Sequence, residues 1–313
     1  MEQEFQISRM SNEQISLLIP LYQAAFKRTY TEKYLAKKFD TSMFGKSNWG
    51  FVAKNENGEA IAFYAIFANV MHVDGKRITV AQSADTMTHP QYQGKGLFVT
   101  LAKKTFELAL QDGCDLIFGF PNGNSLPGFV KKLNWINHAN MLEFTIKINT
   151  IPVLPFLSKL GFGTQVFKKI VNQFLKPIAL NELSKSNLII DSQLNGQVRD
   201  EHFFKYKKYG KNFITSINRK QVWLKLDHRL IIGDIEKVNE LELHQILYHL
   251  KKLCFAVGIN KIIIQTTPNI YINSYLKTFP NIQVKDTIPF CYLNGTSVEV
   301  NKIGFTSLDW DTF

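Results

Sequence analysis

Two dipeptides constrain the fold of this chain more than any other feature of its sequence. Asn57-Gly58 and Asp74-Gly75 each separate two apolar runs. Such pairs are the strongest short-range signal of a tight turn between antiparallel strands. The sequence therefore predicts two successive hairpins that together reach about His89, and hence an antiparallel sheet.

A loop, a helix and a buried strand follow the second hairpin. "HPQYQGKGLF", residues 89–98, leads into "LFVTLAKKTFELALQDG", whose apolar spacing predicts a helix that stops at Gly113. "CDLIFGF" is typical of a short strand covered on both faces. With helices expected over residues 11–40, the first half is predicted to be an antiparallel sheet followed by a β-α-β crossover.

The last third of the chain repeats this order in outline. "DGCDLIFGFPN" and "VGINKIIIQTTPN" both run from a helix-ending glycine through an apolar strand to Pro-Asn. We therefore expect one domain over residues 1–150, a linker over 151–190 and a second domain over 191–313. The amphipathic helix of the linker is expected to pack between the domains, and the alternative is a helix lying on a membrane surface. The second copy reads "EKVNELELHQ" in place of the glycine loop, so only the first is expected to hold a phosphate.

Composition narrows the class of partner. The 313 residues carry a formal net charge of +11, which favours acidic partners. The lysines are scattered and no zinc-finger spacing occurs, so phosphorylated small molecules fit better than nucleic acid. Three widely separated cysteines form no disulfide framework and indicate the cytoplasm. The sequence also lacks an apolar run long enough to span a membrane.

The Gly94-Lys95-Gly96 loop has a direct chemical interpretation. A helix begins with unpaired N–H groups and the positive end of its dipole, and glycines allow those donors to approach a pyrophosphate closely. Lys95 adds a positive charge beside them. The alternative is an ordinary tight turn. The dinucleotide-binding fingerprint fits less well, because a third spaced glycine and a leading parallel strand are missing.

"THPQYQGKGLF", followed by "FGFPNGNSLPGFVKKLNW", resembles the acyl-CoA site of the GNAT superfamily of N-acetyltransferases. The resemblance covers about residues 1–150 and is specific over residues 85–135. It implies an α/β (α+β) fold with a mixed, largely antiparallel sheet and flanking helices, followed by a second, degenerate GNAT-like domain. It also implies acyl-CoA as co-substrate, either acetyl-CoA or a small hydroxyacyl-CoA, and no metal.

The resemblance assigns roles to three groups of residues. The backbone of Met87 and Thr88 would meet the acyl carbonyl and the pantetheine arm. Two asparagines that follow the buried strand, Asn122 and Asn124, would bond the pantetheine amides. The pyrophosphate loop would comprise Gln93, Gly94, Lys95, Gly96, Leu97 and Phe98.

Two departures from the family pattern concern the chemistry. Phe98 stands where the loop usually has a small residue, and it is expected to narrow or reshape the start of the helix. Phe129 occupies the position of a tyrosine that protonates the leaving thiolate in many members, so Tyr92, a water or unassisted departure must serve instead. Asp85, on the strand entering the loop, is the candidate general base, and its alternative role is a structural hydrogen bond.

Other candidate groups are weaker. His72 is expected at the far end of a hairpin, and His89 is expected to cap or pack beside the loop. The terminal "SLDWDTF" brings together Asp309, Asp311 and the carboxylate of Phe313. A solvated tail is the expectation there, although some tandem-domain relatives place the chain terminus in the acceptor site.

The acyl acceptor is inferred from charge. A single CoA domain followed by a degenerate second copy resembles two groups of tandem acyltransferases. One group acts on nucleotide-linked amino sugars for surface polysaccharides, such as dTDP-3-amino-3,6-dideoxyhexoses, and the other acts on aminoglycosides. A protein of net charge +11 attracts the anionic nucleotide sugar and repels a polycation. A non-catalytic acyl-CoA-binding module is the hypothesis from another class, and it is motivated by Phe129. The sequence does not indicate an oligomeric state.

Overall fold

The computed structural model describes residues 5–151, 178, 183–210, 212–226, 228–296 and 298–313. The chain divides into two compact units, which we call unit 1 (Met1–Ala139 and Ile288–Glu299) and unit 2 (Asn140–Thr287 and Val300–Phe313). The predicted first domain is one continuous segment, residues 1–150, whereas unit 1 combines two separate segments of the chain. The predicted linker helix lies outside the described residues.

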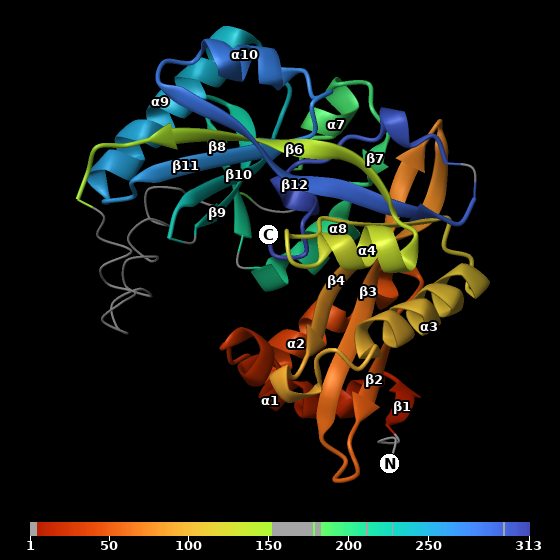
Figure 1. Cartoon of the computed structure of the whole chain (residues 1–313). Coiled ribbons are helices and arrows are strands. Elements are labelled where there is room, and N and C mark those ends of the chain that lie inside the picture. Colours follow the sequence, from red (N-terminus) through yellow and green to blue (C-terminus); the bar gives the residue numbers. More distant parts are fainter. Residues whose placement is uncertain (1–4, 152–177, 179–182, 211, 227, 297) are drawn as a thin grey trace. The chain divides into compact units, whose positions relative to one another are not determined.

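Unit 1 is built on the two predicted hairpins (Figure 1). Strands β2 (Gly50–Lys54), β3 (Ala60–Val73) and β4 (Lys76–Thr88) pair antiparallel in that order. Asp74 and Gly75 both have positive φ, at 48° and 79°, as a two-residue turn of the mirror-image type requires. Gly58, in the loop before β3, has φ 78°. Both hairpin predictions are confirmed.

The sheet of unit 1 has the order β1-β2-β3-β4-β5-β12. β1 (Gln6–Arg9) lies antiparallel to β2, and β5 (Leu116–Gly119) lies parallel to β4. The outer neighbour of β5 is β12 (Ile282–Asn294), which pairs antiparallel from Cys291 opposite Gly119 to Asn294 opposite Leu116. The sheet is therefore mixed and largely antiparallel, as predicted.

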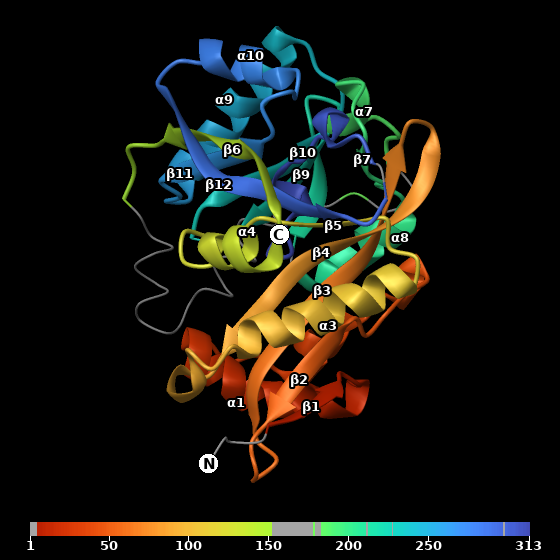
Figure 2. The same cartoon turned by 45° about the vertical axis from the view of Figure 1, so that its right-hand side comes forward.

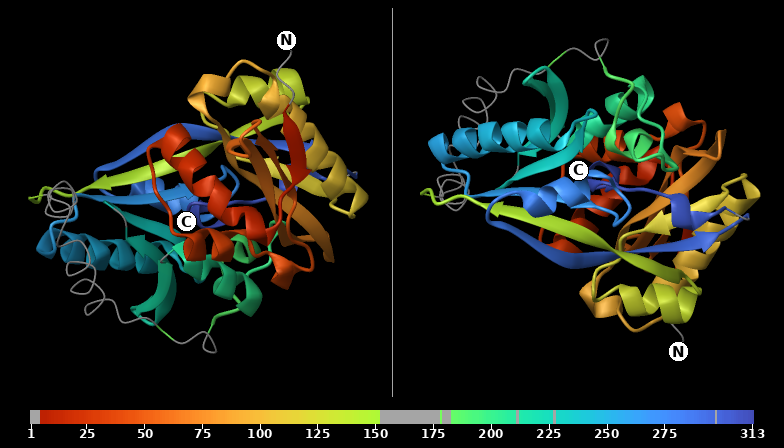
Figure 3. Two further views of the ribbon diagram at one scale, coloured as in Figure 1. Left: turned by 90° about the horizontal axis from the view of Figure 1, so that it is seen from below. Right: turned by 90° about the horizontal axis from the view of Figure 1, so that it is seen from above.

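Helices cover both faces of this sheet. α1 (Ile15–Phe26) and α2 (Glu32–Phe39) pack on one face, and α3 (Leu97–Gln111) and α4 (Leu126–Leu133) pack on the other, as the left view of Figure 3 shows for α1, α2 and α3. α3 runs along β3 and β4 in Figure 2. Alternate residues of β3 face the two layers, since Phe63, Ala65 and Phe67 join the first core and Tyr64, Ile66 and Ala68 join the second.

Unit 2 contributes further strands to the sheet and has a core of its own. From Asn140 onward β6 (Ile136–Lys147) pairs antiparallel with β11 (Lys261–Thr266), and β11 lies parallel to β10 (Leu230–Ile235). β9 (Lys220–Leu226) and β8 (Asn212–Ile217) complete the order. The remaining elements are β7 (Gly196–Gln197) and helices α7 (Leu188–Asp191), α8 (Glu201–Lys207), α9 (Glu240–Ala256) and α10 (Ile272–Thr278).

The two units contain the same crossover. In unit 1, α3 connects the parallel strands β4 and β5, and in unit 2, α9 connects the parallel strands β10 and β11. One face of α9 packs onto the sheet through the apolar stripe Leu243, Ile246, Leu247, Leu250 and Cys254. None of the helices in the described part of the chain is long and apolar enough to cross a membrane.

Candidate acyl-CoA site

The site in unit 1 begins where β4 and β5 part. Their parallel pairing runs from Val80 opposite Leu116 to Gln82 opposite Phe118. β5 then ends at Gly119, whereas β4 continues to Thr88 while still pairing with β3. β4 therefore extends beyond the end of β5, and over residues 84–88 the edge of β4 that faces away from β3 is not paired with β5. Met87 and Thr88, the residues predicted to contact the acyl group, lie at the end of this stretch.

A β-bulge occurs in this stretch. Asp85 and Thr86 together lie opposite Tyr64, which shifts the register of β4 against β3 by one residue. Asp85 adopts φ 48°, in the left-handed region that aspartate tolerates better than most residues. Bulges bend a strand and redirect its side chains, and they occur often beside active sites.

The carboxylate of Asp85 is held by two side chains from the α1/α2 layer. Lys38 Nζ lies 2.8 Å from each carboxylate oxygen, and Tyr22 Oη donates to Oδ2 at 2.7 Å. The side chains of Lys38 and Asp85 are 7% and 10% exposed, so the ion pair is largely buried. Lys38 Nζ also lies 5.5 Å from the ring centroid of Phe67.

The opposite face of the bulge is held by Tyr64. Its hydroxyl and the hydroxyl of Ser83 lie 2.6 Å apart, and the phenol also interacts with Thr86. Burial raises the pKa of Tyr64, because the phenolate would lose its solvation, so this hydroxyl stays protonated. Ser83 and Thr86, which lie before and after Asp85 in β4, thus both contact a β3 side chain that faces α3 and α4.

The glycine loop presents open backbone at the start of α3. Gly94 and Gly96 have φ 79° and 76°, and a Cβ added at either would meet no atom within 4 Å. Gly96 is the N-cap of α3, and no side chain caps this end of the helix. The first N–H groups of α3 therefore face exposed space in which an anion could be bound.

Polar and aromatic side chains surround this loop. Lys95 is exposed and lies over two rings, 5.2 Å from the centroid of Tyr92 and 5.6 Å from that of Phe5. His89 accepts a hydrogen bond from the N–H of Gln91 through Nδ1 at 3.3 Å and caps a short 3-10 helix, in agreement with its expected capping role.

His72 pairs with Arg77 beside the Asp74-Gly75 turn, at the far end of the hairpin, as predicted.

The two aromatic departures from the family pattern pack into the core beneath the loop. The ring of Phe98 lies 5.5 Å from that of Phe129 and 5.8 Å from that of Tyr64. It also covers Gly128, where an added Cβ would come within 2.9 Å of it. Phe98 thus points toward α4, and α3 begins at Leu97 with the loop open. Phe129 is 5% exposed and packs against Trp135 at 4.6 Å.

Asn122 organises the turn between β5 and α4. Its Oδ1 accepts hydrogen bonds from the backbone N–H of Asn124 at 3.0 Å and of Ser125 at 3.1 Å. The acceptor of this side chain is therefore used within the turn. Its amide N–H groups are the part suited to a pantetheine carbonyl, and Asn124 is exposed beside it. The predicted pantetheine contacts of both residues stay predictions.

In the crossover of unit 2, side chains cap the start of α9, whereas no side chain caps the start of α3 in unit 1. Asn239 Oδ1 accepts from the N–H of Glu242 and Glu242 Oε2 accepts from the N–H of Asn239, both at 2.9 Å. This capping box satisfies the end of α9 with its own side chains, and Glu240 adds a second carboxylate in the first turn. A cavity of about 580 Å³ beside it is lined by charges of both signs, from Asp191, Glu236 and Glu242 and from Lys220 and Lys237. That only the first copy holds a phosphate stays a prediction.

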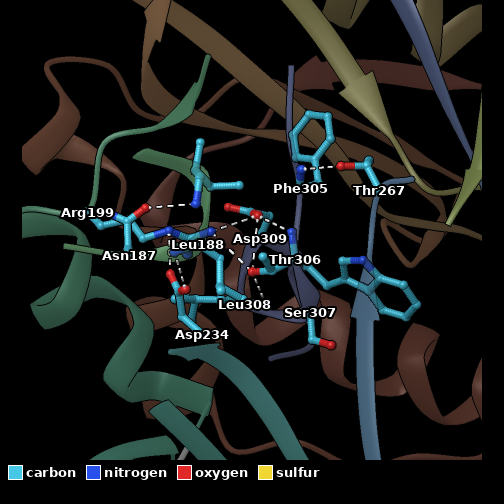
Figure 4. Close-up of polar contacts among 12 residues, drawn as sticks. Asn187, Leu188, Arg199, Asp234, Thr267, Phe305, Thr306, Ser307, Leu308 and Asp309 are labelled. Carbon is cyan, nitrogen blue, oxygen red and sulfur yellow. Dashed lines mark hydrogen bonds and ion pairs between the residues drawn. The ribbon is translucent and has the colours of Figure 1, made fainter. Parts of the chain in front are cut away.

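The terminal segment is buried in unit 2, which corrects the expectation of a solvated tail. Asp309 is fully buried, and its Oδ2 accepts from the N–H of Thr306 and forms an ion pair with Arg199 at 3.0 Å (Figure 4). Arg199 also pairs with Asp234 at 2.8 Å. Phe313 is 3% exposed and lies against Gly233, where an added Cβ would come within 2.3 Å of its ring.

Backbone carbonyls of the same segment are also bound. The carbonyl oxygens of Trp310, Asp311 and Thr312 accept hydrogen bonds. The donors are Lys207, Tyr209 and Lys225, in that order. These contacts could not be predicted from the sequence, because they join residues about a hundred positions apart. Among the described residues no cluster of three or more His, Cys, Asp or Glu side chains is placed to hold a metal.

Sequence reasoning also missed Lys38. A signal was present in "EKYLAKKF", since Leu35 and Phe39 mark the apolar stripe of α2 and Lys38 falls three residues after Leu35, on the same face. A lysine on the buried face of a helix is rarely found without a partner. The identity of that partner, 47 positions away in β4, could not be read from the sequence.

We compared the sequence and the fold of this chain with those of known proteins. Residues 6–136 match the sequence model of the acetyltransferase (GNAT) domain. No curated protein matches the sequence. A GCN5-related N-acetyltransferase from Kribbella flavida is 11% identical, with TM-score 0.62, over 93% of this chain and 71% of that one. A probable N-acyltransferase from Enterococcus faecalis V583 is 12% identical, with TM-score 0.60, over 93% and 73%. The N-myristoyltransferase of Saccharomyces cerevisiae with bound myristoyl-CoA is 10% identical, with TM-score 0.59, over 94% and 83%. At these identities the structures show a shared fold.

Proposed function

We propose that this chain, a CoA-dependent acyltransferase with a GNAT domain over residues 6–136, acylates the amine of a nucleotide-linked amino sugar. The observation that carries the CoA part is the pair of open glycines at the start of α3, beside the parted ends of β4 and β5. Backbone donors at a helix start suit a pyrophosphate, and Lys95 adds a charge close by. The site would be formed by the residues assigned from the resemblance, namely Met87, Thr88, Gln93, Gly94, Lys95, Gly96, Leu97, Phe98, Asn122 and Asn124.

The reaction would be direct transfer. The neutral amine attacks the thioester carbonyl, a C–N bond forms, the C–S bond breaks and its electron pair leaves with sulfur. Backbone groups of Met87 and Thr88 would orient the carbonyl. Phe129 is buried among aromatic rings and carries no proton to give, so the thiolate would take a proton from Tyr92 or from water, or would leave unassisted.

Charge supports the choice of acceptor. A net charge of +11 favours a nucleotide diphosphate-linked sugar over a polycationic aminoglycoside, which is the second candidate. A role in surface polysaccharide synthesis, with acetyl-CoA or a small hydroxyacyl-CoA as donor, follows from that class of acceptor. The three cysteines are free and buried, which agrees with a reducing compartment such as the cytoplasm.

Calorimetric titration of CoA and acetyl-CoA tests the proposal. Micromolar affinity, about −8 kcal/mol, is expected for the wild type and loss of binding for Gly96→Val. CoA release is then followed with a dTDP-3-amino-3,6-dideoxyhexose and, separately, with an aminoglycoside. Release with the first alone supports the proposal, and release with the second alone favours the other acceptor. Tight CoA binding with turnover of neither would favour the non-catalytic binding module, for which the buried Phe129 is the supporting observation.

A further inference from the structure

We propose that Lys38 is a positioning residue of the acyl-CoA site, and that Asp85 acts with it to hold the bulge of β4 rather than to take a proton from the acceptor. The inference deepens the proposed function and rests on it, because the backbone that the bulge positions is the part of β4 assigned to the acyl group. Lys38 has no role in the resemblance described above.

The bulge determines which backbone groups of β4 face away from β3, on the edge that extends beyond the end of β5. Beyond it Met87 lies opposite Phe63, one residue out of step with the pairing before it. A strand presents its N–H and C=O groups alternately to its two edges, so a slip of one residue would exchange the groups facing β3 for those facing away. The backbone groups of Met87 and Thr88 therefore keep their direction relative to β3 only if the bulge stays at Asp85 and Thr86.

The ion pair is placed to keep it there. Asp85 is the residue with positive φ, and its side chain leaves the strand toward α1 and α2, where Lys38 and Tyr22 bind it. Both carboxylate oxygens already accept hydrogen bonds or an ionic contact at 2.7–2.8 Å. These three contacts fix the carboxylate on the side of α1 and α2. The geometry therefore favours the structural hydrogen bond over the general base.

Unit 2 provides independent support. Its crossover strand β10 carries a register shift between Ile232 and Asp234, and Asp234 is paired with Arg199 at 2.8 Å. The same combination, an aspartate at the irregular point of the crossover strand and a buried cation beside it, thus occurs in both units. Only unit 1 has an open loop for CoA, since α9 is closed by its capping box. Because unit 2 has such an ion pair but no open loop, the comparison indicates that the pair maintains the shape of the strand and does not serve proton transfer.

Charge-neutral replacement of the pair separates the two roles. We compare Lys38→Met, Asp85→Asn, the double variant carrying both changes, and Lys37→Met as control. Lys37 is the exposed neighbour on the same helix. Each single change removes one charge of a buried ion pair and keeps the other, whereas the double variant removes both charges. Asparagine also tolerates positive φ and still accepts the hydrogen bond from Tyr22.

The expected kinetic result is a loss in the single variants and a recovery in the double variant. With acetyl-CoA and a dTDP-3-amino-3,6-dideoxyhexose, each single variant should lose at least tenfold in kcat while its affinity for CoA stays within twofold. The double variant should return to within about threefold of wild type, and Lys37→Met should equal wild type. If Asp85 is the general base, every variant carrying Asp85→Asn stays inactive, the double variant included, and the inference is overturned.

Amide hydrogen exchange over residues 85–88 gives a readout that needs no acceptor. Exchange there should accelerate in both single variants, and should stay at the wild-type rate in the double variant and in Lys37→Met. Unchanged exchange in the single variants would also overturn the inference. Wild-type protein that binds no CoA would instead refute the proposed function, and intact CoA binding in a double variant that does not recover would refute only the role of the pair.

Discussion

Replacing Gly96 with alanine is expected to separate the cost of backbone strain from the loss of a ligand site. Gly96 has φ 76°, where an L-residue costs roughly 1–2 kcal/mol, and an added Cβ meets no atom within 4 Å. The folded protein should therefore lose only this strain energy. For a unit of this size, a loss of 1 kcal/mol lowers Tm by about 2–4 °C.

The effect on CoA should be larger. The new methyl group would occupy open space at the start of α3, where a pyrophosphate bound by the first N–H groups of that helix is expected to lie. Hydrogen bonds to a charged group contribute roughly 1.5–3 kcal/mol each. Losing one or two of them amounts to about 3 kcal/mol, or more than a hundredfold in Kd.

Gly58 offers a matched control. It has φ 78°, it is exposed, and an added Cβ there also meets no atom within 4 Å, but it lies in the loop before β3. Gly58→Ala should lower Tm by as much as Gly96→Ala and leave CoA affinity unchanged, as measured by melting and titration calorimetry on both variants. Equal CoA affinity in the two variants and the wild type would mean that the loop is only a turn, and the argument for a pyrophosphate site would be refuted.

Three further predictions concern stability. Burial lowers the pKa of Lys207 to about 7, so above that pH the unfolded chain binds more protons than the folded one, and stability should rise between pH 7 and 8.5 by roughly 1.5 kcal/mol; urea midpoints should show this gain in wild type and not in Lys207→Met. Asp309→Ala leaves Arg199 short of one counterion and breaks the cap at Thr306, so urea unfolding should report a loss of about 3 kcal/mol, and a loss below 1 kcal/mol would contradict this account. The cysteines are buried and burial raises their pKa, that of Cys254 to about 12, so a thiol reagent at pH 8 should react only as fast as the protein opens; rapid labelling of the native state would show that these sites are accessible.

Local signals in the sequence predicted most of the elements. The turn chemistry of Asp74-Gly75 and the apolar spacing of α3 depend on residues that are near neighbours in the chain, and both predictions are confirmed. The open glycines at the start of α3 were also foreseeable, because a helix start and its preceding residues are contiguous. β1 and β8 were not predicted, since each is short and carries little periodic signal.

Contacts between distant segments could not be predicted. The pairing of β12 with β5 joins residues about 175 positions apart, and no local pattern indicates which strand will complete an edge. The same holds for Lys38 and Asp85, since the burial of Lys38 follows from helix spacing but its counterion does not. The register shift that places Asp85 at a bulge is likewise a property of two paired strands, and it cannot be read from one of them.

The discontinuity of unit 1 has a consequence for how the protein is made. The outer neighbour of β5, residues 291–294 of β12, is synthesised about 175 residues after β5 itself. Throughout translation of residues 140–287, unit 1 would carry an unpaired strand edge, the kind of surface that associates with other chains. A fragment ending near residue 150 would keep that edge permanently. Studies of the isolated acyl-CoA half should therefore fuse residues 288–299 onto it rather than truncate the chain.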